Sequence, residues 1–158
     1  MKKINKDNKR NSKNSGFTLI EILVVIGIIA VLAAVVLVAI NPGRQFKIAR
    51  DSQRISNVTA ILNAISQNIA ENKGIFKCAS FDIPATSTVI KYNSSTDTIA
   101  PCLIPNYISS LPFDPSATGA HFTNSGDYDT QYSVFEDNQG RITVSAVGEI
   151  TADINVLR

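Results

Sequence analysis

The chain has 158 residues, 44% hydrophobic and 18% charged, which is enough for one folded domain with an appendage. Its net charge of +2 is uneven, because six basic residues and one acidic residue give the first sixteen residues +5 and leave −3 for the rest. The basic balance therefore belongs to a short tail, and the apolar run that follows it within a few residues argues against a nucleic-acid-binding arm.

Residues 1–16 are polar, basic and without periodicity, so we expect them to be unstructured. From residue 17 to residue 40 only Thr18 and Glu21 are polar. As a helix rising about 1.5 Å per residue, residues 17–40 would be roughly 36 Å long, enough to cross a hydrocarbon core of about 30 Å. The rest of the chain is too short to bury such a helix in a soluble core, so we predict a transmembrane helix over 17–40.

The charges on either side of this span predict its orientation. Six basic residues precede it, and three follow it: Arg44, Lys47 and Arg50. The positive-inside rule then keeps the N-terminus in the cytoplasm and exports the C-terminal part. We therefore expect a single-pass protein of the cytoplasmic membrane.

An ordinary secretory signal peptide is the alternative interpretation of residues 1–40. Such peptides have an apolar region of about 7–15 residues with a small-x-small cleavage site behind it. This apolar run is longer, and Glu21 is atypical at its start. Ala39-Ile40-Asn41 is a poor cleavage site, whereas cleavage after one of three earlier alanines stays open: Ala30, Ala33 and Ala34.

Asn41-Pro42-Gly43 interrupts the helical run, since proline lacks a donor and clashes with the preceding turn, so we predict a kink at Pro42. Asn41 could cap a restarting helix whose first residue is Pro42. Helical periodicity then predicts an amphipathic continuation over 41–74, ending near Gly74. Its apolar stripe consists of Ile48, Ile55, Val58, Leu62, Ile65 and Ile69. Its polar face consists of Arg50, Asp51, Arg54, Asn57, Asn63 and Asn68.

Residues 75–158 have the sequence patterns of strands and loops. Alternating patterns predict strands at 87–92, 131–136, 141–147 and 150–156. The second and third of these flank a turn in which Gly140 takes a positive φ. Two stretches read as loops, 107–115 and 116–130. The predicted fold class is α+β: a long N-terminal helix, transmembrane in its first half, whose outer half packs on a small antiparallel sheet formed within 75–158.

The residues Gly16 to Glu21 (GFTLIE) follow a basic leader and open an unbroken apolar run. This arrangement resembles the type IV prepilin and pseudopilin signature, which has a glycine, a hydrophobic aromatic residue and a glutamate five positions along. The resemblance implies that a prepilin peptidase cuts after Gly16 on the cytoplasmic side, leaving Phe17 as an N-methylated N-terminus. A protease can approach the Gly16 backbone closely, and cleavage removes five net positive charges.

Glu21 is the most informative residue of this segment, because a carboxylate in an apolar membrane helix is unfavourable and usually has a partner. The resemblance implies that this partner is the Phe17 amine of a neighbouring subunit, a pair acting more on register than on net stability. The alternative is that Glu21 snorkels to water near the helix end. For Pro42 the resemblance implies a point where the helix loosens during subunit packing, and a simple end of the span stays open.

In the exported part, Cys78 and Cys102 are expected to form a disulfide, with two separate buried thiols as the alternative. The bridge would close a loop of about 25 residues, worth roughly 3–4 kcal/mol in the chain-entropy model. Residues 111–115 (LPFDP) resemble a proline-framed loop of major type II secretion pseudopilins. Some of those proteins bind calcium, and four acidic residues could supply oxygen ligands or simply be solvated: Asp127, Asp129, Glu136 and Asp137.

No catalytic grouping emerges, since His121 is the only histidine and no nucleophile motif surrounds any serine, so we predict neither an enzyme nor a cofactor or metal. We predict a structural subunit of a type IV pilus or secretion pseudopilus, found in an extracytoplasmic or cell-surface filament after assembly. Its expected partners are further pilin subunits (in a homopolymer or mixed filament), prepilin peptidase, the assembly machinery, and lipid before assembly, but no nucleic acid. The alternative is a single-pass anchor for an extracytoplasmic binding domain that does not polymerise.

Overall fold

A computed structural model describes residues 16–79, 81–93 and 98–158 of the chain. Of the leader predicted over 1–16, only Gly16 lies within the described residues. The chain divides into two compact units, Met1–Asn41 and Pro42–Arg158.

In the first unit, residues 16–41 are described, and they contain one helix, α1 (Leu19–Ile40). Thr18 is its N-cap, with extended backbone angles, and Glu21 lies in its first turn. No residue of α1 is buried within the unit, and its mean hydropathy of 3.4 makes it long and apolar enough to cross a membrane. An apolar helix without a protein covering needs either lipid or other helices around it.

The helical run is interrupted at Asn41, which has left-handed backbone angles (φ 49°, ψ 78°). Helix α2 (Pro42–Glu71) begins at the next residue, so proline occupies a first helical position, where its missing N–H is tolerated. At the other end, the Gly74 N–H donates to the Ile69 carbonyl at 2.9 Å. Lys73 precedes Gly74 with a φ of 62°, so a lysine takes the left-handed position that usually favours glycine.

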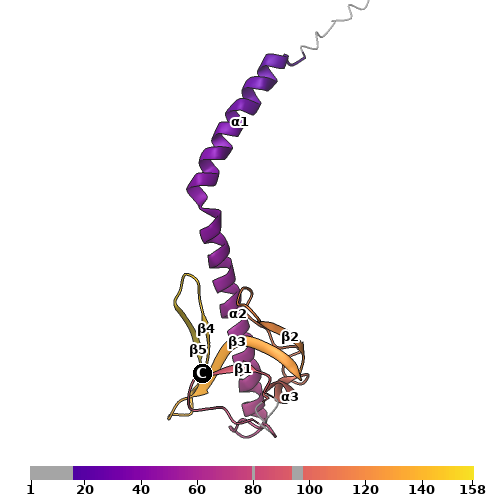
Figure 1. Cartoon of the computed structure of the whole chain (residues 1–158), viewed down its shortest axis with the longest axis vertical. Coiled ribbons are helices and arrows are strands. Elements are labelled where there is room, and N and C mark those ends of the chain that lie inside the picture. Colours follow the sequence, from indigo (N-terminus) through magenta and orange to yellow (C-terminus); the bar gives the residue numbers. More distant parts are fainter. Residues whose placement is uncertain (1–15, 80, 94–97) are drawn as a thin grey trace, which may run out of the picture. The chain divides into compact units, whose positions relative to one another are not determined.

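The second unit also contains a five-stranded antiparallel sheet, beside the C-terminal part of α2 (Figure 1). Its strands are β1 (Thr88–Lys91), β2 (His121–Asn124), β3 (Asp127–Glu136), β4 (Ile142–Val147) and β5 (Asp153–Leu157). The order is β1-β3-β4-β5. Asp129 of β3 pairs with Lys91 of β1 and with His121 of β2, so β1 and β2 lie on opposite sides of β3. Strands β2 and β4 therefore pair with the same edge of β3, β2 near the start of β3 and β4 near its end.

Two elements differ from the sequence-based expectation. Residues 116–130 were expected to be a loop, which is wrong, because they contain β2 and the first residues of β3. Their many turn-forming residues predict a loop, although part of the segment forms a short hairpin. In its turn the Gly126 N–H donates to the Asn124 side chain at 2.8 Å. A short helix, α3 (Ala100–Leu103), was not expected. The predicted positive φ at Gly140, in the β3–β4 turn, is confirmed at 76°.

The core of the second unit lies between α2, α3 and one face of the sheet. Its largest fully buried side chains are Tyr132, Ile61, Ile65, Ile99, Leu103 and Leu111. Burying each of these contributes roughly 1.5–3 kcal/mol relative to exposure.

The buried stripe of α2 differs from the predicted one. Ile55, expected to be in the apolar stripe, is 48% exposed, whereas Asp51 and Arg54, expected on the polar face, are only 5% and 3% exposed. Asn57 and Asn68 of that predicted polar face are buried too. The prediction of an outward polar face is therefore wrong at these positions, because their side chains pair with groups on other elements.

Candidate functional site

The junction between Gly16 and Phe17 lies in a non-helical segment just before α1. The Phe17 side chain is 84% exposed. A Cβ added at Gly16 would meet no atom within 4 Å, so nothing in the described chain requires a glycine there. A bond in exposed, non-helical backbone is accessible to a protease, whereas a helix would withhold its N–H and C=O groups.

Thr18 and Glu21 form a reciprocal capping box at the start of α1. The Glu21 Oε2 atom accepts from the Thr18 N–H at 2.8 Å and from the Thr18 hydroxyl at 2.9 Å. In return, the Glu21 N–H donates to the Thr18 hydroxyl oxygen at 3.3 Å. The capping box satisfies helix-end donors that would otherwise be unpaired, and it places a negative charge at the positive end of the helix. Sequence reasoning missed this role, although the Thr-x-x-Glu spacing was visible.

This geometry gives Glu21 a partner within its own chain. Both bonds from Thr18 converge on Oε2, so a further donor can approach the carboxylate at Oε1. The Phe17 amine predicted as that donor arises only after cleavage, and the pairing stays a prediction. The cleavage after Gly16 and the methylation of Phe17 stay predictions too.

The family model of the prokaryotic N-terminal methylation motif matches residues 11–37, which include the Gly16–Phe17 junction, the capping box and most of α1. The chain carries the type IV pilin and pseudopilin signature. No curated protein and no solved structure matched the chain significantly. The signature and the apolar helix together fit a pilin-like, membrane-anchored subunit with a structural rather than enzymatic role.

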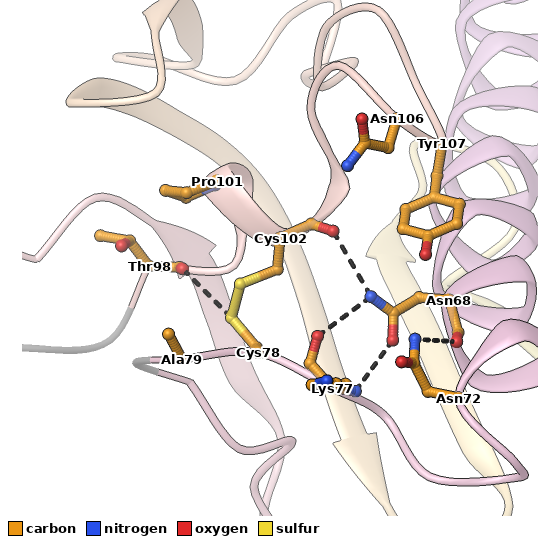
Figure 2. Close-up of a pocket in the computed structure, with 10 residues that line it drawn as sticks. All are labelled: Asn68, Asn72, Lys77, Cys78, Ala79, Thr98, Pro101, Cys102, Asn106 and Tyr107. Atoms are coloured by element: carbon orange, nitrogen blue, oxygen red, sulfur yellow. Dashed lines mark hydrogen bonds between the residues drawn. A yellow bond between two sulfur atoms is a disulfide. The ribbon is translucent and has the colours of Figure 1, made fainter.

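In the second unit, Cys78 and Cys102 form a disulfide with a Cα–Cα distance of 5.3 Å. Asn68 of α2 lies beside it, only 3% exposed (Figure 2). Its Nδ2 donates to the Lys77 carbonyl at 3.0 Å and to the Cys102 carbonyl at 3.4 Å, while its Oδ1 accepts from the Lys77 N–H at 2.8 Å. One amide side chain thus holds both disulfide-bonded segments against α2.

We expect that replacing both Cys78 and Cys102 by serine lowers the free energy of unfolding by about 3 kcal/mol, because the unfolded chain regains the freedom of the opened loop. Denaturant titration of the full chain in detergent, followed by near-ultraviolet circular dichroism, measures this loss. A reductant should produce a similar loss in the wild type and none in the double variant. Equal stability of the two proteins would show that the disulfide contributes little.

Arg54 of α2 lies at the buried centre of an ionic cluster, which we call the Arg54 cluster: Arg50, Asp51, Arg54, Asp114, Ser116 and Glu149. The Nε and Nη2 atoms of Arg54 donate to the two oxygens of Asp114 at 2.7 and 3.0 Å. Its Nη1 donates to Asp51 at 2.7 Å and to Glu149 at 3.1 Å, and its Nη2 also donates to the Ser116 hydroxyl at 2.7 Å. All five N–H donors of the guanidinium are therefore used.

The Asp51 carboxylate receives three backbone N–H groups from the turn between β4 and β5. Glu149 donates at 2.8 Å, Ile150 at 2.8 Å and Thr151 at 3.1 Å. These bonds, that of Glu149 above all, hold the pKa of Asp51 well below its usual range. The turn begins with Gly148, where a Cβ would lie 2.0 Å from the Thr151 carbonyl oxygen, so no other residue fits without moving the backbone.

The other two carboxylates of the Arg54 cluster are also ionised. Hydrogen bonds from Arg50, supported by Arg54, lower the pKa of Glu149 to about 2. Burial acts to raise the pKa of Asp114, but hydrogen bonds from Arg54 and from the Ser116 and Ala117 N–H groups outweigh it and lower that pKa. The cluster thus joins α2, the loop after residue 113 and the β4–β5 turn through charged hydrogen bonds.

The acidic residues considered for calcium do not converge on one point. The Oδ1 atom of Asp127 lies 3.0 Å from Nε2 of the His121 ring. Asp137 accepts hydrogen bonds from the Gln139 and Arg141 N–H groups of the β3–β4 turn. Within the part of the chain that the structure describes, no three His, Cys, Asp or Glu side chains form a group that could hold a metal ion. The Asp127 carboxylate pairs with a histidine, and the Asp137 carboxylate accepts hydrogen bonds within a turn.

Proposed function

We propose that the chain is a structural subunit of a type IV pilus or a secretion pseudopilus, cut after Gly16 by a prepilin peptidase and methylated at Phe17. The observation that supports this most strongly is the combination of two features. The methylation motif covers residues 11–37, and the helix α1, most of which it includes, has no buried residue in its own unit. A helix of this kind is suited first to lipid and then to a bundle of identical helices.

The proposed sequence of events begins with insertion of 17–40, N-terminus inside, into the cytoplasmic membrane. Removal of the leader takes away five net positive charges, which favour the cytoplasmic side and would resist withdrawal of the helix from the bilayer. The helix beginning at Phe17 then packs laterally against other copies. Residues 41–74 continue the helix into the head formed with 75–158, which coats the filament.

Lateral packing of α1 gains little from hydrophobic burial, because lipid tails are as apolar as the helix surface. Shape and polar pairing must therefore select the register. Gly27, Ala30 and Ala34 recur at spacings of three and four, which gives one face of α1 small residues for close helix approach. Glu21 is the only ionisable side chain of α1, so the Phe17 amine of a neighbouring copy is the partner that would fix the register.

Glu21→Gln tests the assembly role of the carboxylate. It removes the charge but keeps the side-chain length and an oxygen that can cap Thr18. We expect normal membrane insertion and normal leader removal, but at least about tenfold fewer filaments, because a neutral amide pairs weakly with the amine. Immunoblotting of the sheared and membrane fractions measures filaments and unassembled subunits separately.

Glu21→Asp is the matched control, since it keeps the charge and should retain more filaments than Glu21→Gln. If Glu21→Gln formed as many filaments as the wild type, the carboxylate would have no role in assembly. If the wild type formed none in cells that assemble other pilins, the chain would instead be a single-pass anchor for a binding domain.

A further inference from the structure

One face of the sheet is turned away from α2. On β3, Tyr132 and Val134 are buried on the face toward the core, and on β4 Val144 and Ala146 are, so Ser133 and Ser145 between them face outward. In the register of the sheet, Ser133 of β3 lies beside Ser145 of β4. Ser145 in turn lies beside Asn155 of β5. A row of short polar side chains therefore crosses three strands on the outer face.

This row forms the floor of a trough. Phe135 lies two residues along β3 from Ser133 on one side, and Gln131 lies two residues away on the other. Both side chains are longer than the serines between them, so the outer surface is hollowed over the Ser133–Ser145 pair. The resulting cavity has a volume of about 310 Å³ and also has Asp153 in its lining. That is the size of a small ligand pocket, for which about 300–1,000 Å³ is typical.

We propose that this trough binds a short saccharide, neutral or cationic. Its lining offers serine hydroxyls, which donate and accept, and the amides of Gln131 and Asn155, which do the same. Within the described residues, none of these side-chain groups is used in a hydrogen bond inside the chain. A sugar presents hydroxyls of the same two-way kind, and its C–H face can lie on the apolar ring of Phe135.

The lining also argues against other ligand classes. An extended peptide adds to the edge of a sheet through main-chain hydrogen bonds, whereas the trough lies on the face of three paired strands. A nucleic acid needs basic side chains for its phosphates, and the trough is lined by none. Asp153, its one charged residue, would repel anionic sugars and favour those with an amine. The inference concerns the second unit alone and does not require a filament.

The test is an amide-shift titration of the full chain by NMR, in a detergent without a sugar head group such as lauryldimethylamine oxide. The probes are four trisaccharides: maltotriose and tri-N-acetylchitotriose, which are neutral, chitotriose, which is cationic, and trigalacturonate, which is anionic. We expect saturable shifts centred on Ser133, Ser145 and Asn155 with at least one neutral or cationic probe. Trigalacturonate should bind at least about tenfold more weakly.

Ser145→Phe should fill the trough and weaken binding at least about tenfold, while the sheet tolerates it because phenylalanine favours strands. Ser109→Phe, in an exposed loop outside the trough, is the matched control and should bind as the wild type does. Far-ultraviolet circular dichroism verifies that both variants are folded. The proposal is overturned if no probe gives saturable shifts at the trough, if Ser145→Phe binds as tightly as the wild type, or if trigalacturonate binds best.

Discussion

Replacing Gly16 by leucine is expected to leave the sixteen-residue leader on nearly every molecule of the membrane-bound protein. A Cβ at Gly16 meets nothing within 4 Å in the described chain, so the substitution does not disturb α1 or its capping box. The effect must then arise in the peptidase, which approaches the backbone before Phe17 most closely where no side chain intervenes. Intact mass spectrometry of the membrane fraction measures whether the leader is present.

Gly27→Leu is the matched control for Gly16→Leu. It introduces the same side chain within α1, where a Cβ also meets nothing within 4 Å, but far from the junction. Its leader should be removed as in the wild type. If the leader were absent from both Gly16→Leu and the wild type, or present on both, the claim that the peptidase requires Gly16 would fail.

The largest expected effect on the stability of the head is that of Arg54→Ala. The side chain of Arg54 is 3% exposed, and those of Asp51 and Asp114 are 7% and 5% exposed. Removing the guanidinium leaves buried carboxylates without their cation, and breaking a buried pair in this way typically destabilises a protein by about 3–5 kcal/mol. Denaturant titration of the full chain, read by the near-ultraviolet signal of its buried tyrosines, gives the free energy of unfolding.

Arg50→Ala is the control for Arg54→Ala, because it removes one cation from the same cluster at a half-exposed position. The Arg50–Glu149 pair has side chains 34% and 24% exposed, so solvent replaces much of what is lost. We expect a much smaller loss for Arg50→Ala. Arg54→Lys should fall between the two, since it keeps the charge but has fewer donors. Equal small losses for Arg54→Ala and Arg50→Ala would mean that the Arg54 cluster is not what joins α2 to the sheet.

The elements that depend on neighbouring residues could be predicted from the sequence. The unbroken apolar run predicted α1, and the alternation around Gly140 predicted the hairpin of β3 and β4. The proline marked the neighbourhood of the interruption, which the structure has one residue earlier, at Asn41. In each case the residues that determine the element are close to one another in the sequence.

The buried polar stripe of α2 could not be predicted in this way. Arg54 has its main partner, Asp114, sixty positions away, and Asp51 receives its N–H groups from a turn nearly one hundred positions away. Periodicity assigns charged residues to the outside, since it contains no information about such distant partners. The misassigned face of α2 follows directly from this.

The capping box was missed by the sequence-based prediction for a different reason. Thr18 and Glu21 are only three residues apart, and their spacing is a local signal for a helix start. A charge in a membrane helix points to a partner outside the chain, and that expectation leaves out the bond from Thr18. The two roles are compatible, because capping uses one oxygen of the carboxylate and assembly would use the other.

The most direct test is the N-terminal residue of the wild-type chain recovered from sheared surface filaments, determined by intact mass and fragmentation. The proposed processing and assembly predict a chain that begins at Phe17 and carries one methyl group on its amine. A chain that begins at Met1, or one cut behind the apolar run as a secretory signal would be, would contradict this, since either chain lacks the Phe17 amine on which the pairing with Glu21 depends.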